Sequence, residues 1–257
     1  MNKSDFIQAF AATLLAGLVS CSKDPAPAPD LGYNYFPDKV GSYVVYNVDS
    51  IVYNAHSYSY PAITDTFRFQ VKEKIESGYT DNEGRATLRL ERYVKHFDPA
   101  IPYSQMPWTL RDVWAENKTI RRAEKVEENV RFVKLAFPVK EGQEWNGNAQ
   151  NTLEAKNYTY SFFDIPRTIG NIHFDSVLQV DQYNELDLVH QKYYEEKYAR
   201  NTGLIYKRVI DIQSQPPDWS MEPYMNDSLS VFFAKPILKR ASAGMQYTMT
   251  VTSYGTE

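Results

Sequence analysis

The sequence lacks most of the features that would point to a known chemistry. It has one cysteine and four histidines in 257 residues, too few for a disulfide framework or a cysteine-rich metal site. The short motifs of hydrolases, zinc proteases, P-loop proteins and dinucleotide-binding proteins are also missing. The formal net charge is only -4, with both signs interspersed, which disfavours nucleic-acid binding. We therefore expect no nucleic-acid partner, no cofactor, no metal site and no enzymatic activity.

Aromatic residues are plentiful, with 20 tyrosines and 13 phenylalanines, and both residue types favour strands. Apolar and polar residues alternate along Thr66–Glu76, Arg85–Val94 and Met245–Thr252. A period of two places one face of a strand in the core and the other in water. The polar stretch Asp81–Gly84 between the first two runs reads as a turn, and a second turn is expected at Asn117-Lys118. The sequence therefore predicts antiparallel hairpins.

The same pattern continues along the chain without a visible internal repeat. Two stretches, 120–134 and 186–199, fit either a strand or a helix, and we favour strands in both. One short helix is expected near 225–233. Hairpins without long helices between them predict a single all-β domain at 33–257. Its antiparallel strands would form a sandwich or a partly open barrel.

The first residues have the pattern of a secretory signal. Lys3 precedes an apolar run, Phe6–Val19, which is too short to cross a bilayer and matches the core of a signal peptide. The run ends in Leu18-Val19-Ser20-Cys21, which resembles the lipobox of bacterial lipoprotein precursors. This resemblance implies that residues 1–20 are removed and that Cys21 receives a diacylglycerol and an N-acyl chain such as palmitate. Several acyl chains together make a stable membrane anchor.

Residues 21–32 form the lipidated N-terminus and a linker, whose Pro25–Pro29 stretch is extended and semi-rigid. Ser22-Lys23-Asp24 resembles a shortened acidic export signal of Bacteroidota-type lipoproteins. This resemblance implies an outer-membrane lipoprotein that faces either the cell surface or the periplasm. The segment Glu195–Lys207 is similar to a hairpin of uncharacterised β-rich bacterial lipoproteins, a family with no known activity.

One loop has the composition of a binding site. Trp145, Asn146 and Asn148 lie together in the polar segment Lys140–Asn151, and an aromatic ring beside amide groups can hold a sugar. However, Asn146-Gly147 is also a strong turn signal, and a tryptophan beside a turn commonly closes the end of a core. The sequence leaves a ligand contact and a core plug as alternatives for Trp145.

Three Asp-Ser-apolar triplets resemble the acceptor motif for protein O-glycosylation in Bacteroidota. Their serines are Ser50, Ser176 and Ser228.

The adjacent carboxylates in Glu127-Glu128 and in Glu195-Glu196 do not form acid–base pairs, because neighbouring side chains on a strand point to opposite faces. Solvent-exposed faces explain them.

We expect a lipid-anchored binding or assembly module of the cell envelope, held to the membrane by Cys21. Its ligand would be an apolar molecule, a glycan or a partner protein. Two alternatives are a structural accessory that docks on an outer-membrane complex and a hydrolase with a dispersed site. A perturbed carboxylate in a closed pocket would favour the hydrolase. A flat exposed apolar patch would favour docking, and an open apolar trough would favour ligand binding.

The lipid anchor is directly testable. Replacing Cys21→Ser removes the thiol that the lipobox resemblance marks for acylation. We expect the variant to lose metabolic labelling with a fatty-acid analogue and to leave the membrane fraction. Labelling and fractionation that match the unaltered protein would refute the anchor.

Overall fold

The computed structural model describes residues 29–54, 62–216 and 229–257. Residues 31–257 form one compact unit. The predicted signal peptide, Cys21, Ser228 and most of the linker lie outside the described residues. So does the first part of the helix expected near 225–233, of which the described part forms α2 (Leu229–Ala234). None of the described helices is long and apolar enough to cross a bilayer.

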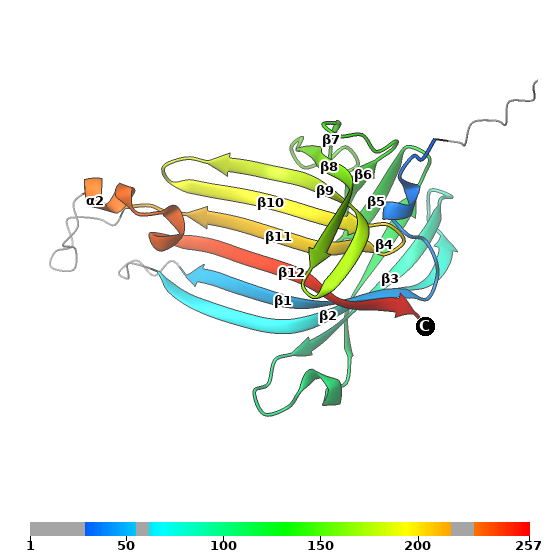
Figure 1. The fold of residues 1–257 in the computed structure, drawn as a ribbon, viewed down its shortest axis with the longest axis horizontal. Helices are drawn as coiled ribbons and strands as arrows, with labels where there is room; N and C mark the ends of the chain where they lie inside the picture. The colour runs from blue at the N-terminus through cyan, green and yellow to red at the C-terminus, as the bar shows by residue number, and fades with distance from the viewer. Residues whose placement is uncertain (1–28, 55–61, 217–228) are drawn as a thin grey trace, which may run out of the picture. The chain divides into compact units, whose positions relative to one another are not determined.

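The described residues form twelve strands in one antiparallel sheet that is nearly closed into a barrel (Figure 1). The strands are β1 (Ser42–Asn54), β2 (Ile63–Thr80), β3 (Ala86–His96), β4 (Thr109–Lys118), β5 (Arg122–Glu127), β6 (Val130–Ala136), β7 (Glu144–Asn146), β8 (Asn157–Ile169), β9 (Ile172–Leu186), β10 (His190–Ala199), β11 (Gly203–Gln213) and β12 (Ala243–Thr256). The all-β prediction is confirmed, and of its two forms the partly open barrel is the one observed.

The strand order is a simple meander closed by its first and last members. Every strand pairs with its neighbours in sequence except at β6 and β7, and β12 pairs with β1. The remaining break lies between β6 and β7, which are the two edges of the sheet. We call this break the seam.

The two stretches that fit either a strand or a helix, 120–134 and 186–199, form strands, as we predicted. β5 and β6 fill most of 120–134 and are joined by a turn in which Glu128 and Asn129 have positive φ angles of 49° and 64°. Such a two-residue turn matches the twist of the strands that it joins. In 186–199, the Asp187 carboxylate accepts the backbone N–H groups of Val189 and His190, and this turn leads into β10.

Two local predictions are wrong. The turn expected at Asn117-Lys118 lies later, where the Thr119 hydroxyl accepts the backbone N–H groups of Arg121 and Arg122. The polar segment 140–151 is not entirely loop, because it contains the short strand β7. In both places the hydrogen bonds of the neighbouring strand override the local composition.

The segment before β1 closes one end of the barrel. It contains the short helix η1 (Tyr33–Tyr35). The Lys118 ammonium donates to the backbone oxygen atoms of Tyr33 and Phe36 at 3.4 and 2.9 Å. The Asn201 N–H donates to the Asn34 carbonyl at 2.7 Å. These bonds tie the segment to the end of β4 and to the turn that follows β10.

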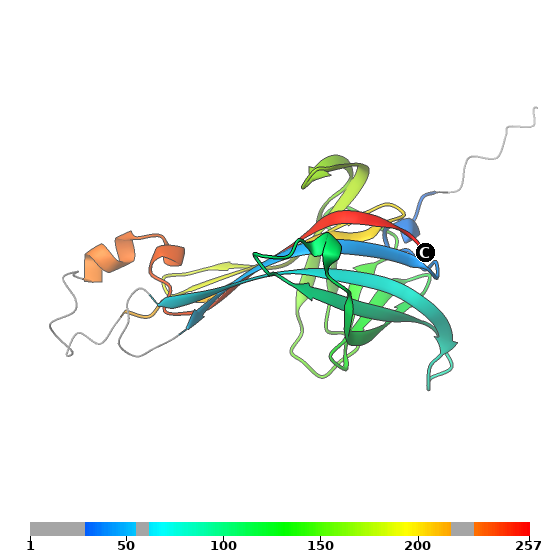
Figure 2. The ribbon, with the colours of Figure 1, turned by 90° about the horizontal axis from the view of Figure 1, so that it is seen from below.

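The hairpin of β8 and β9 adds a second layer on the outside of the sheet. Its tip lies over β12, where a Cβ atom on Gly170 would be 3.4 Å from the Val251 carbonyl. Phe174 packs against Tyr254, with ring centroids 5.6 Å apart. Figure 2 shows this hairpin arching over the strands, while the strands that follow β2 curl beneath them. At the far end, the short helix η3 (Ile237–Lys239) packs against Ile210 and Ile212 of β11.

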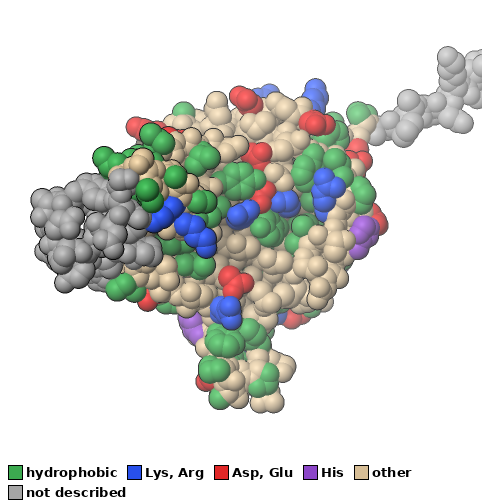
Figure 3. All heavy atoms as spheres, turned by 60° about the vertical axis from the view of Figure 1, so that its left-hand side comes forward, with side chains coloured by type: hydrophobic (Ala, Val, Ile, Leu, Met, Phe, Trp, Pro, Cys, Tyr) green, Lys and Arg blue, Asp and Glu red, His purple; other side chains and the backbone are tan. Residues whose placement is uncertain are grey.

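The connection between β3 and β4 projects from the sheet and is rich in uncharged side chains (Figure 3). It contains the short helix η2 (Tyr103–Gln105) and exposes Phe97 and Ile101. The Lys95 ammonium donates to the Tyr103 carbonyl at 2.8 Å and lies 4.3 Å from the centroid of the Trp108 ring. Lys95 therefore holds the base of the projection together with the Phe97 N–H, which donates to the Arg68 carbonyl at 3.1 Å.

The seam is bridged by single contacts rather than by a strand ladder. The Val133 N–H of β6 donates to the Gly147 carbonyl at 2.8 Å, and its carbonyl accepts the Trp145 indole N–H at 3.0 Å. The Tyr160 hydroxyl donates to the Ala136 carbonyl at 2.7 Å. The Trp145 ring is half-buried, and its centroid is 4.4 Å from that of Tyr160. Trp145 therefore links both edges of the sheet.

Replacing Trp145→Ala should remove this link. We expect a loss of about 3 kcal/mol in the free energy of unfolding, as for other buried aromatic residues. Trp145→Phe should cost less, about 1 kcal/mol, because it keeps the ring and loses one hydrogen bond. Chemical denaturation measures both.

Trp108→Ala is the matched control, since Trp108 lies in the projection away from the seam. It should change the free energy of unfolding less than Trp145→Ala does. A Trp145→Ala variant of unchanged stability would instead leave the ring available as a ligand contact.

Candidate functional site

Charged side chains occupy the inner face of the barrel. In β2, Glu73 lies between Val71 and Ile75 on the buried face, directly opposite Arg92 of β3. In the same way, Glu116 of β4 lies opposite Lys125 of β5. All four charged side chains are less than a tenth exposed. The strand alternation therefore directs charges, as well as apolar groups, into the interior.

These four residues form the first ion cluster. Arg92 Nε is 3.0 Å from Glu73 Oε1, and Lys125 Nζ is 2.8 Å from Glu73 Oε2. Lys125 Nζ is also 3.4 Å from Glu116 Oε1. The Arg92 guanidinium lies over the Trp114 ring at 3.7 Å from its centroid. Glu73 thus holds two cations, and the same ring also faces the Lys125 ammonium at 5.3 Å.

A second ion cluster spans the seam. Lys134 of β6 is 2.6 Å from Glu196 of β10 and 3.4 Å from Glu127 of β5. Lys207 is 3.3 Å from Glu196, whose other oxygen atom accepts the Tyr198 hydroxyl at 2.6 Å. The expectation that Glu127, Glu195 and Glu196 lie on solvent-exposed faces is wrong, and Glu195 is only 6% exposed. Glu196 is 1% exposed, because the closing barrel buries the face that an open sheet would leave in water.

A cavity of about 150 Å³ lies between the two clusters. Charged side chains of both clusters line it together with aromatic and aliphatic groups. The apolar part of its wall includes Phe36, Tyr46, Trp114, Leu204, Tyr247 and Met249. The cavity therefore offers apolar surface and charges of both signs to the same small volume.

The carboxyl groups of the two clusters differ in protonation. Burial raises the pKa of Glu116 to about 7, and the charge of Glu73 adds to this while Lys125 opposes it. Burial also acts on Glu73, but Lys125 and Arg92 outweigh it and lower the Glu73 pKa. Lys134 and Lys207 outweigh burial at Glu196 and lower its pKa to about 2. Glu116 is therefore the interior carboxyl group that changes charge near neutral pH.

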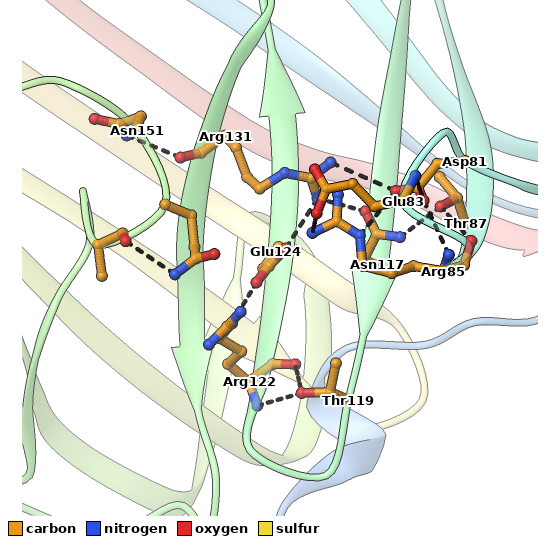
Figure 4. A network of polar contacts seen from close by, with 12 residues as sticks. Asp81, Glu83, Arg85, Thr87, Asn117, Thr119, Arg122, Glu124, Arg131 and Asn151 are labelled. Atoms are coloured by element: carbon orange, nitrogen blue, oxygen red, sulfur yellow. Dashed lines mark hydrogen bonds and ion pairs between the residues drawn. The ribbon is translucent and has the colours of Figure 1, made fainter.

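A separate polar network lies on the opposite face of β5 (Figure 4). Glu124 is 1% exposed and contacts Arg122 and Arg131. Arg131 Nη1 also donates to Asn117 at 2.6 Å, and Arg131 Nη2 is 3.8 Å from Asp81. This network joins the tip of the β2–β3 hairpin to β4, β5 and β6. Its groups bond to one another and line no part of the cavity, so we assign it a structural role.

The predicted contacts Trp145, Asn146 and Asn148 do not reach the cavity. Asn146 Oδ1 accepts the backbone N–H groups of Asn148 and Lys156, both at 2.9 Å, and Asn148 Nδ2 donates to the Glu154 carbonyl at 2.6 Å. The two amides therefore hold their own loop. Ligand contact at these three residues stays a prediction.

Two of the three predicted glycosylation sites lie in the described residues. Ser50 is 7% exposed within β1. Ser176, on β9, donates to Asp164 at 2.6 Å and accepts from Arg200 Nε at 2.7 Å. A transferase would have to displace these contacts in the folded protein. Modification at Ser50, Ser176 and Ser228 stays a prediction.

No family model matches the chain, and no curated protein or solved structure is significantly similar to it. No group of histidine, cysteine, aspartate and glutamate that could hold a metal ion occurs among the described residues. The case for a site therefore depends on the cavity and the two ion clusters. One sequence signal could have revealed them. Glu73 and Arg92 interrupt the apolar face of two alternating strands.

Glu116 should make the stability depend on pH. Its folded-state pKa of about 7 lies above the ordinary value of 4.5, so between these values the folded protein binds a proton that the unfolded chain has released. The free energy of unfolding should therefore fall as pH rises from 5 to 7, with Glu116 contributing about 3 kcal/mol. Glu116→Gln should remove this contribution.

Chemical denaturation at several pH values measures the effect. The exposed Glu141→Gln is the matched control and should keep the slope of the unaltered protein. Parallel pH profiles for Glu116→Gln and the unaltered protein would show that Glu116 does not titrate in this range.

Proposed function

We propose that the chain is a lipid-anchored binding module of the bacterial cell envelope whose ligand enters the barrel interior. The main support is the cavity between the two ion clusters, with its mixed apolar and charged lining. Concave sites that combine apolar walls with a few polar groups are the usual form of small-molecule sites. An apolar or aromatic small molecule fits this lining best.

The energetics of the interior also support a binding role. Buried ion pairs contribute little net stability, because the loss of hydration offsets their attraction. An interior cavity lowers stability further, since its lining loses packing contacts. An interior selected only for stability would be filled with apolar side chains. The observed interior instead keeps charges beside an open volume.

The enzyme alternative has one observation in its favour, the raised pKa of Glu116. A perturbed carboxyl group in a pocket is a candidate acid or base. Its nearest charged neighbours, Glu73 and Lys125, are already paired with each other at 2.8 Å. We therefore keep binding as the proposal.

Docking on an outer-membrane complex is the second candidate. The β3–β4 projection exposes Phe97 and Ile101 at 52% and 44%, and the adjoining β4 exposes Leu110 and Val113. Exposed apolar side chains gathered on one projection are typical of interaction surfaces. If this surface docks, Phe97→Asp should abolish membrane-complex association and leave ligand binding in the barrel unchanged.

Fluorescence of N-phenylnaphthylamine, a neutral aromatic probe that brightens in apolar sites, tests the binding proposal. We expect saturable binding to the unaltered protein. Leu204→Trp should abolish it, because the half-buried Leu204 side chain lines the cavity and a larger ring would fill it. Thermal melting establishes that the variant is folded.

Leu186→Trp is the control, since Leu186 is 69% exposed at the end of β9. It should bind the probe like the unaltered protein. Absence of saturable binding, or equal binding by the folded Leu204→Trp variant, would refute the cavity as the site.

A further inference from the structure

The inner face of the sheet continues beyond the closed part of the barrel. Along β10, Lys192 and Tyr194 lie on the same face as Glu196, whose side chain contributes to the cavity. Tyr194 is paired with Tyr183 of β9 and Val209 of β11. The Tyr183 and Tyr194 ring centroids are 5.5 Å apart. These half-buried rings form an aromatic wall next to the second ion cluster.

Two lysines lie against this wall. The Lys156 ammonium is 4.1 Å from the centroid of Tyr194 and 4.7 Å from that of Tyr183. The Lys192 ammonium is 5.6 Å from the centroid of Tyr183. Within the part of the chain that the structure describes, neither ammonium group has a carboxylate within 4 Å, in contrast to Lys125, Lys134 and Lys207.

The charges around Lys156 are mostly of its own sign. Burial and the neighbouring Lys134, Lys192 and Lys207 lower its pKa to about 8, and Asp211 acts in the opposite direction. The Asp211 carboxylate accepts a hydrogen bond from the Tyr194 hydroxyl, and it forms no ion pair with Lys156. Another acidic group near the wall, Glu185, hydrogen-bonds to Tyr183. A bound anion would therefore give Lys156 a partner of opposite charge.

We propose that Lys156 and Lys192 bind the anionic head of an amphipathic ligand whose apolar part lies in the barrel. This deepens the proposed function and rests on it. The ammonium groups supply charge-assisted hydrogen bonds to a carboxylate, and the tyrosine rings hold them in place. The adjoining inner face offers Val209 of β11, which pairs with Tyr247 of β12, and Met245, which pairs with Asp211. The ligand class is an apolar chain or ring with one terminal anionic group.

Calorimetric titration with decanoate and decanol tests the proposal. The two probes share a chain length and differ in the charge of the head group. We expect decanoate to bind the unaltered protein more tightly than decanol. Lys156→Gln should weaken decanoate binding about tenfold, the value of one charge-assisted hydrogen bond, and should change decanol binding less than twofold.

Matched variants separate charge from packing. Lys156→Arg keeps the cation and should retain most of the decanoate affinity, whereas Lys192→Gln should weaken it. Lys140→Gln, at an exposed position before β7, should have no effect. Circular dichroism and thermal melting check that each variant is folded.

The outcomes distinguish the two proposals. If neither probe binds, the anion site fails together with the proposed function. If decanol binds as tightly as decanoate, or if folded Lys156→Gln binds decanoate normally, the anion site is refuted and the binding module stands. An equal loss of both probes in Lys156→Gln would assign Lys156 to packing and would also refute the anion site.

Discussion

The rest of the structure depends on the pairing of charges inside the barrel. Removing one partner of a buried ion pair leaves a charge without compensation, at a cost of about 3–5 kcal/mol. Glu73 holds Arg92 and Lys125, and these three side chains come from β2, β3 and β5. A shift of one residue in any of these strands would turn its charge outward and leave the others unpaired. The ion clusters therefore fix the strand register more strictly than apolar contacts do.

The second cluster extends the same constraint to strands that are not neighbours. Lys134 and Glu196 belong to β6 and β10, which lie on opposite sides of the seam. Their contact at 2.6 Å can form only when the sheet is curled, so it stabilises the closed form of the sheet directly. Trp145 and Tyr160 act at the same place through backbone carbonyl groups. Closure is thus achieved by side chains where a hydrogen-bonded ladder is missing.

The sequence predicted the strands because alternation is a local property. Thr66–Glu76 and Met245–Thr252 lie within observed strands, and Arg85–Val94 does so from Ala86 onward. It did not predict that Glu127 and Glu196 would be buried, because their burial depends on partners far along the chain. Lys134 contacts Glu196 across 62 residues, and no local pattern encodes such a contact. The sequence did not predict the cavity for the same reason, because residues from strands in both halves of the chain line it.

The pairing of β1 with β12 has a consequence for how the protein folds. Residues 42–53 find their partners at 244–256, so one side of β1 remains an unpaired edge until almost the whole domain has been synthesised. Contacts between such distant segments are slow to form, because a long loop must close before they contribute. An exposed edge with Val44, Tyr46 and Val48 is prone to pair with other chains during that time. The protein should therefore need protection from aggregation until β12 is in place.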